Sequence, residues 1–348
     1  MIAANRPSRK SRKLMVVTSD GHIEDRDRLE IGQLFRPGDL VVANDAATLP
    51  ASLRGSHELT GEPIEIRLAG FLPTDEPTVG HLTRFVAVVF GEGDYQMRTE
   101  DRPDPPPLAS GDRLRLGPLI ALVERLLDHP RLIAVHFVGE PARVTAGLAK
   151  HGRPIQYSHV PEGLELWDVW TNLAAEPFAF EAPSAGFALS WNALSTWKRR
   201  GIEFATLTHA AGISSTGDPK LDERLPFDEP YIIPATTADS IAAARERGGA
   251  VIAIGTTVAR ALESAAAGDG SVRAGKGTAR GRIGADTTLQ VVDTILTGVH
   301  QPGESHFELL RAFADDSVLQ RIHEAATERH YRTHEFGDSL LIQRRDAA

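Results

Sequence analysis

The sequence predicts an α/β main domain into which a small all-β barrel domain is inserted. Three observations carry this prediction. Apolar runs of strand length alternate with helical segments over residues 141–348, the stretch 56–140 contains short alternating strands, and a chain of 348 residues is long enough for two domains. We therefore expect residues 1–55 and 141–348 to form the main domain in two parts, with residues 56–140 forming the inserted barrel.

The first part of the main domain is predicted to open with a hairpin. Residues 14–17 are an apolar run typical of a strand, and Asp20-Gly21 supplies a turn. A second apolar run, residues 40–43, ends at Asn44 and Asp45. Ligands of parallel sheets bind outside the carboxyl ends of strands, which makes this polar pair a candidate site; an Asx turn explains it equally well.

Short strands separated by Gly, Pro and Asp clusters define the predicted barrel. Residues 64–68 and 114–116 alternate apolar and polar side chains, and residues 85–90 are apolar and mostly β-branched or aromatic. A proline cluster at 103–107 falls between two of these strands. This spacing is typical of an all-β barrel or sandwich.

Helices and strands alternate in the second part of the main domain. Trp167 and Trp170 stand three residues apart, a spacing that favours the core over a base-stacking surface. We expect helices at residues 190–200, 237–247 and 317–330 and directly after Gly255, strands at 202–208, 250–254, 291–296 and near Leu340, and a capping box at Ser305–Glu308.

Composition excludes several classes of protein. The chain has no cysteine, which removes disulfides, zinc fingers and thiolate catalysis, and its 13 histidines show no H-E-x-x-H spacing, so we expect no metal. No apolar run approaches the roughly 20 residues of a membrane span, and we expect no secretory signal and a cytoplasmic location. The net charge of −9 argues against a general nucleic-acid coat.

Two basic stretches are nevertheless candidate phosphate contacts. One spans residues 6–13, and the other contains Arg273, Lys276, Arg280 and Arg282 in a glycine-rich segment. A solvated tail and a solvated loop are the alternative interpretations.

The strongest local signal for a ligand site follows the predicted strand at 250–254. Gly255 lets the backbone approach a ligand closely, Thr256 and Thr257 can cap the next helix or bind a ligand, and a helix N-terminus favours anions. Arg260 and Glu263 share one helix face. A capped helix with a surface ion pair is the alternative.

Ser184 is a second candidate. It lies in Ala182–Gly186, which lacks the first glycine of a nucleophile elbow, so a binding-loop hydroxyl is favoured over a hydrolase nucleophile.

Taken together, several segments resemble the S-adenosylmethionine:tRNA ribosyltransferase-isomerase family of queuosine biosynthesis. They follow the family's order and cover nearly the whole chain, and the resemblance implies the same interrupted layout. The matching segments are Arg36–Leu40 with Asn44-Asp45 and Pro50-Ala51, Ala182–Gly186, Gly255–Ser264, Val292-Asp293 with Thr297, His300 and Pro302, and Tyr331 with Phe336–Ile342.

The resemblance implies a transferase that moves the ribosyl moiety of S-adenosylmethionine onto a 7-aminomethyl-7-deazaguanine base in tRNA and isomerises it, forming epoxyqueuosine. Adenine and methionine are released, S-adenosylmethionine is a co-substrate, and neither a metal nor a permanently bound cofactor is implied. Such chemistry needs a base to remove a proton next to the sulfonium, an acid to assist adenine departure, and exclusion of water.

The resemblance also suggests roles for individual residues. Glu263 and Asp45 are the acid and base candidates, with either assignment open, and the imidazole of His300 suits a proton shuttle near neutral pH. The candidate substrate-binding residues are Asn44, Ser184, Gly186, Gly255, Thr256, Thr257, Arg260 and Asp338, and the candidate RNA-binding residues are Arg273, Lys276, Arg280 and Arg282.

Departures from the family pattern leave other functions open. Ala46-Ala47 replace the usual Thr-Arg, Phe187-Ala188-Leu189 replace Leu-His-Phe, and Phe227 stands where the family has histidine. The alternatives are a divergent paralogue with a different acceptor, and a non-catalytic nucleoside- or RNA-binding protein. The expected partners are S-adenosylmethionine and tRNA, and the expected state is a monomer.

Overall fold

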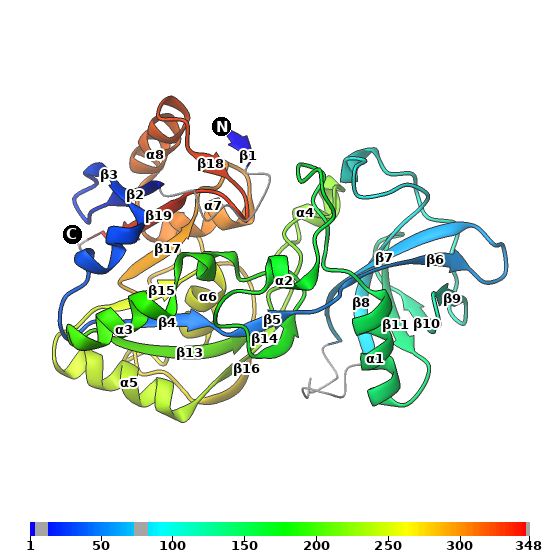
Figure 1. The fold of residues 1–348 in the computed structure, drawn as a ribbon, viewed down its shortest axis with the longest axis horizontal. Coiled ribbons are helices and arrows are strands. Elements are labelled where there is room, and N and C mark those ends of the chain that lie inside the picture. The colour runs from blue at the N-terminus through cyan, green and yellow to red at the C-terminus, as the bar shows by residue number, and fades with distance from the viewer. Residues whose placement is uncertain (4–12, 73–82, 346–348) are drawn as a thin grey trace.

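The computed structural model describes residues 1–3, 13–72 and 83–345. A large mixed sheet with helices on both faces forms one body, and a closed barrel forms the other (Figure 1). This confirms the predicted fold class.

The main body is built on a mixed sheet whose four central strands are parallel. The strands described in this sheet are, in spatial order, β16 (Gly275–Ala279), β14 (Glu229–Ile233), β13 (Glu203–His209), β4 (Leu40–Asn44), β15 (Val251–Ile254), β17 (Thr294–Gly298), β19 (Ser339–Gln343), β2 (Lys13–Val17) and β3 (Ile23–Asp27). Strands β13, β4, β15 and β17 run parallel, and the hairpin β2–β3 is antiparallel as predicted. All residues of β4 and β15 are buried, as is usual for parallel strands covered on both faces.

Helices and short elements cover and connect the main sheet and the barrel. The α-helices are α1 (Pro141–His151), α2 (Leu166–Val169), α3 (Trp191–Arg199), α4 (Pro219–Asp222), α5 (Ala235–Glu246), α6 (Thr256–Ala265), α7 (Ser305–Leu309) and α8 (Asp316–Glu328). The 3₁₀ helices are Arg28–Leu34, Thr99–Asp101, Ser184–Ala188 and Leu310–Ala312. Two small sheets pair β1 (Ile2–Ala3) with β18 (Arg332–Thr333) and β5 (Ala46–Thr48) with β12 (Glu176–Ala179).

Alternate residues of the central strands face two different hydrophobic cores, since successive side chains of a strand point to opposite faces. Leu40 and Val42 of β4 join the cluster that contains buried residues of α5, α6 and α8. Val41 and Ala43 join the cluster on the other face, which contains Trp197 of α3. The sheet is thereby held between helical layers, and the carboxyl ends of its central strands meet at one edge.

Six antiparallel strands close the barrel. Their order around it is β10 (Leu119–Leu126), β11 (Leu132–Phe137), β8 (Arg84–Phe90), β7 (Pro63–Phe71), β6 (Ser52–His57) and β9 (Arg113–Leu116). An aromatic cluster packs the barrel onto the main body: Phe71 of β7 contacts Phe178 and Phe180, with ring centroids 5.1 and 4.9 Å apart. The boundaries at 55/56 and 140/141, as limits of separately folding units, stay a prediction.

Two local expectations are wrong. Strand β17 begins at Thr294 and not at residue 291, because the backbone amides of Gln290, Val291 and Val292 donate to a glutamate side chain and not to a neighbouring strand. The capping box at Ser305 does not form. Helix α7 is instead preceded by Glu304, whose carboxylate accepts from the backbone amide of Gln301.

The placement of two tryptophans in the core is also wrong. Trp167 is 73% exposed and Trp170 is 44% exposed. Helix α2 has a single turn, and Val169 is its only buried residue, so too little of this segment faces inward to bury the indoles. No helix within residues 1–3, 13–72 and 83–345 is long and apolar enough to cross a membrane.

Candidate active site

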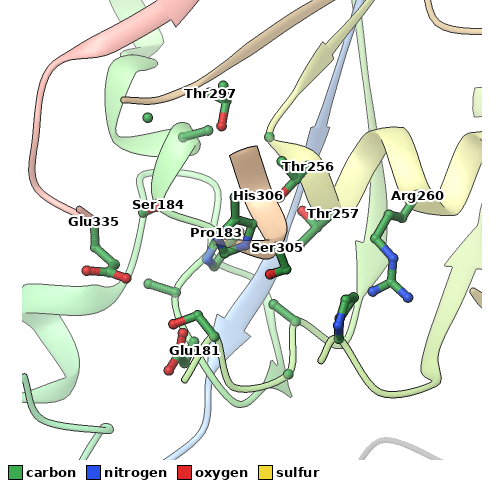
Figure 2. Close-up of a pocket in the computed structure, with 18 of the residues that line it drawn as sticks. Glu181, Pro183, Ser184, Thr256, Thr257, Arg260, Thr297, Ser305, His306 and Glu335 are labelled. Atoms are coloured by element: carbon green, nitrogen blue, oxygen red, sulfur yellow. The ribbon is translucent and has the colours of Figure 1, made fainter. Parts of the chain in front are cut away.

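A cavity lies beyond the carboxyl ends of strands β15 and β17. Ligands of parallel sheets bind in this place. Three segments singled out in the sequence contribute to its wall: Ala182–Ala185, the turn Gly255–Thr257, and the end of β17 at Thr297 and Gly298 with the nearby His300. Figure 2 shows side chains from these segments turned toward a common space.

The turn at Gly255 forms part of the cavity wall. Gly255 has φ +96°, a conformation that L side chains rarely adopt, and a Cβ there would lie 3.4 Å from the Cβ of Ala185. Its amide donates to the carbonyl oxygen of Leu296 over 2.7 Å, which fixes the turn to the end of β17. Thr256 and Thr257 follow at the start of α6 and line the cavity.

Arg260 lines the cavity and also ties neighbouring loops together. Its guanidinium forms a buried ion pair with Glu229 and donates to the carbonyl oxygens of Ala279 and Gly281 over 3.2 and 3.1 Å. Glu229 in turn accepts from the amide of Gly212 over 2.6 Å. Burial lowers the pKa of Arg260 to about 10, so the side chain stays charged at neutral pH. Much of its donor capacity is therefore used within the protein.

Asn44 lies outside the cavity wall and joins two strand ends. Its Nδ2 donates to the carbonyl oxygen of His209, and its Oδ1 accepts from the amides of His209 and Ala46, each over 3.0 Å. His209 is fully buried beside Glu229, and burial together with the Arg260 charge lowers the pKa of this imidazole, which is therefore neutral. The side chain of Asn44 therefore links the end of β4 to the end of β13.

The two carboxylates expected to be catalytic are not brought into the cavity. Glu263 accepts from the backbone amides of Gln290, Val291 and Val292 over 2.7 to 3.0 Å, so its carboxylate holds the segment before β17. Asp45 accepts from the hydroxyl of Thr208 over 2.7 Å. Neither residue is among the described residues that line the cavity.

Two other carboxyl groups do line it. Glu181 directly precedes the Ala182–Gly186 segment, and Glu335 follows the left-handed residue His334. Burial and, to a lesser extent, the charge of Glu335 raise the pKa of Glu181 to about 8, although hydrogen bonds from Ser214 oppose this rise. Burial likewise raises the pKa of Glu335, and its Oε2 finds no hydrogen-bond partner among the described residues. Near neutral pH the cavity therefore holds a protonated carboxyl group.

Two histidines, His300 and His306, line another part of the cavity wall. His300 lies with Nε2 3.2 Å from the hydroxyl of Thr297 and Nδ1 3.5 Å from Glu304, and its ring centroid is 4.7 Å from that of His306. Burial, with a contribution from His300, lowers the pKa of His306 to about 3, which makes it a neutral donor or acceptor. His300 is thus the one of the three expected catalytic residues that the structure places at the cavity.

A wider groove adjoins the cavity. Both spaces are lined by Ser184, Ala185, Thr297, Gly298 and Glu335.

The remaining substrate-binding candidates take different places. Asp338 lines the groove, where its buried carboxylate accepts from the amide of Arg332 over 2.8 Å. Gly186 is buried against Thr171, whose Cγ2 would be 3.0 Å from an added Cβ, and it lines neither space in the described residues.

The four basic residues expected to bind RNA are exposed on or beside edge strand β16. Arg280 lies 3.8 Å from Asp228, and Arg282 donates to the carbonyl oxygen of Glu223. They flank the cavity region without lining it. Residues 6–12 of the other basic stretch lie outside the described residues.

Sequence reasoning missed Glu181, Glu335, His306 and the role of Glu229. The available signal was position: Glu181 directly precedes one matched segment and Glu335 directly precedes another, Phe336–Ile342. Within the described residues, no group of three or more His, Cys, Asp or Glu side chains is arranged to hold a metal ion.

Comparison with known proteins identifies the family of this chain. The family model described as "Queuosine biosynthesis protein" matches residues 1–342. The S-adenosylmethionine:tRNA ribosyltransferase-isomerase of Thiobacillus denitrificans is 31% identical over 97% of this chain and 92% of its own, and that of Trichlorobacter lovleyi is 31% identical over 96% and 93%. The crystal structure of an S-adenosylmethionine tRNA ribosyltransferase from Thermotoga maritima shares the fold, with 22% identity, coverage of 98% and 96%, and a TM-score of 0.51. This chain belongs to the queuosine biosynthesis protein family.

Proposed function

We propose that this chain is an S-adenosylmethionine:tRNA ribosyltransferase-isomerase, which transfers and isomerises the ribosyl moiety of S-adenosylmethionine onto a 7-aminomethyl-7-deazaguanine base in tRNA. The observation that carries the proposal is the cavity itself. It lies where the matched segments converge, and it combines an anion-favouring helix N-terminus at Gly255–Thr257 with the protonatable pair Glu181 and Glu335. The named activity of full-length relatives supports it.

The carboxyl pair supplies the acid and base that the reaction needs. Burial raises the pKa of both carboxyl groups, and the charge of Glu335 raises that of Glu181 further, so near neutral pH Glu181 holds a proton that it can donate. We assign Glu181 as the acid that protonates the departing adenine, and Glu335 as the base that removes the proton next to the sulfonium. These assignments replace Glu263 and Asp45, whose carboxylates are bonded elsewhere.

Hydroxyls and imidazoles would orient the substrate. Thr256 and Thr257 stand at the amino end of α6, where backbone amides favour the methionine carboxylate. His300, Ser305 and His306 also line the cavity. We infer that the burial of this cavity also limits the access of water to reactive intermediates.

The proposal is tested by following S-adenosylmethionine with the purified protein and tRNA that carries 7-aminomethyl-7-deazaguanine. Release of adenine and methionine in equal amounts, dependent on this tRNA, is the expected result. Tight S-adenosylmethionine binding without release from any tRNA would support the non-catalytic alternative. Release with a different acceptor would support the divergent paralogue. We further infer action in the cytoplasm, as a monomer without a resident cofactor or metal.

A further inference from the structure

Three of the four tryptophans gather at the groove that adjoins the cavity. Trp167, Trp170 and Trp191 all line this groove, with exposed fractions of 73%, 44% and 64%, whereas Trp197 is buried in the core. Indole rings are large and mostly apolar. When exposed apolar side chains cluster on a protein surface, they commonly mark a binding site. None of the three rings belongs to a hydrophobic core cluster among the described residues.

The structure holds these rings in defined places. The indole Nε1 of Trp170 donates to the carbonyl oxygen of Thr48 over 3.0 Å, which fixes the plane of this ring. Trp191 is the first residue of α3, and that helix is capped by Ser190, whose hydroxyl accepts from the amide of Ala193 over 3.2 Å. Trp167 extends from α2, whose start is closed by a reciprocal capping box between Glu165 and Asp168. Two of the rings therefore stand on helices with capped N-termini, and the third is held by its hydrogen bond.

The groove and the cavity share part of their walls. Both are lined by Ser184, Thr297 and Glu335. A base that reacts within the cavity must leave its stack, while the nucleotides on either side stay outside and expose their own faces. The tryptophan groove is the adjoining surface on which those faces can be stacked.

We propose that Trp167, Trp170 and Trp191 form a stacking surface for the single-stranded RNA nucleotides that flank the reacting base. This proposal rests on the proposed function, because it takes RNA to be the acceptor, and it assigns recognition of the loop to a surface distinct from the basic strand β16.

The charges of the groove determine how it would bind. Its charged side chains are Arg28, Glu162, Asp168, Glu335 and Asp338, so acids outnumber bases. Phosphate neutralisation therefore does not explain binding here. Stacking does, because it acts on the face of any base and depends little on charge. The contribution of these rings to RNA affinity should accordingly be almost independent of salt.

The test uses the full chain and an RNA hairpin whose loop carries 7-aminomethyl-7-deazaguanine, with binding followed by fluorescence anisotropy at several salt concentrations. Stacking on an aromatic ring is worth about 1–3 kcal/mol per base, so Trp167→Ala and Trp191→Ala should each weaken hairpin binding about five- to 150-fold. The slope of affinity against salt should stay as in the wild type. The affinity for S-adenosylmethionine, measured separately by calorimetry, should not change.

Matched variants separate stacking from a loss of structure. Trp167→Phe keeps an aromatic face and should retain most of the affinity, whereas Trp167→Leu keeps apolar bulk and should not. Leu59→Ala, at a residue 86% exposed in the barrel, should bind the hairpin as the wild type does. Equal binding of the phenylalanine and leucine variants, or unchanged binding by both alanine variants, would overturn the proposal.

The outcome is also distinguishable from failure of the proposed function. If the wild type binds the hairpin with tryptophan-dependent affinity but releases no adenine, the stacking surface stands and the transferase assignment falls. If the wild type releases adenine and the tryptophan variants do so with unchanged KM for the hairpin, the stacking surface falls alone. A wild type that binds no hairpin contradicts both.

Discussion

Glu181 and Glu335 line the same cavity, and burial together with their mutual repulsion raises the pKa of Glu181 to about 8. A carboxyl group with this pKa is protonated through the physiological range and can act as a general acid, which an ordinary exposed glutamate cannot do. The two residues come from segments far apart in the sequence, and only the fold brings them to one cavity.

Glu181→Gln removes the proposed acid while keeping a similar shape. We expect the rate of adenine release to fall by about 10²- to 10⁴-fold, the usual contribution of a general acid, with little change in S-adenosylmethionine affinity. The wild-type rate should decline as pH rises through about 8, because Glu181 then loses its proton. A pH–rate profile of both proteins checks this. A variant with wild-type rate, or a decline at the same pH in the variant, would show that Glu181 is not the acid.

The same carboxyl group predicts a pH dependence of stability. The pKa of Glu181 is about 8 in the folded chain and near its ordinary value of 4.5 when unfolded, so the folded state binds more protons between these values. Stability therefore falls as pH rises from about 4.5 to 8, by an amount on the order of a few kcal/mol. Urea unfolding at pH 5.5 and 8.5 measures it. Glu181→Gln should lose a smaller part of its stability over this range.

Glu263 is predicted to be a structural residue. Glu263→Ala leaves the amides of Gln290, Val291 and Val292 without their acceptor, and each unpaired buried amide costs about 1–3 kcal/mol. We expect a clearly lower urea midpoint, and Glu263→Gln should restore part of it. At a temperature where the alanine variant remains folded, its rate of adenine release should stay within a few-fold of the wild type. A loss as large as that of Glu181→Gln would return Glu263 to the catalytic role.

The buried pair of Arg260 and Glu229 should be essential for the cavity. Breaking such a pair leaves an uncompensated buried charge, and Glu229→Gln should therefore destabilise the protein by about 3–5 kcal/mol. Unfolding in urea measures the loss. The matched control is Asp228→Asn, at an exposed pair with Arg280, which should leave the unfolding midpoint unchanged. Equal midpoints for the two variants would contradict the structural role of the buried pair.

Basic residues on strand β16 are predicted to contact RNA phosphates. Lys276→Ser and Arg280→Ser should each weaken tRNA binding and reduce the slope of log affinity against log salt by about 1. Arg26→Ser is the control, because β3 lies at the opposite edge of the sheet. Titrations of tRNA over a range of salt concentrations check this. A slope unchanged in both β16 variants would remove this strand from the RNA-binding surface.

Much of the fold follows from local patterns in the sequence. The strands β4 and β15 are apolar runs that end in polar or glycine residues, and the turn before α6 requires the positive φ of Gly255. These features depend on neighbours in the chain, which is why residue spacing predicts them.

The contents of the cavity do not follow in the same way. Spacing places Arg260 and Glu263 on adjoining parts of one helix. Only the tertiary structure brings Glu229 to Arg260, and only it brings the amides of residues 290–292 to Glu263. The exposure of Trp167 is likewise set by how little of α2 is covered, and the i, i+3 spacing carries no information about that.

The most direct test of the central claim is the product on the RNA. After incubation of tRNA carrying 7-aminomethyl-7-deazaguanine with S-adenosylmethionine and the protein, the tRNA is digested to nucleosides and analysed by mass spectrometry. The wild type is expected to convert the aminomethyl base to epoxyqueuosine, and Glu181→Gln is expected to convert far less of it. Unmodified aminomethyl-deazaguanine after prolonged incubation, with S-adenosylmethionine intact, would contradict it.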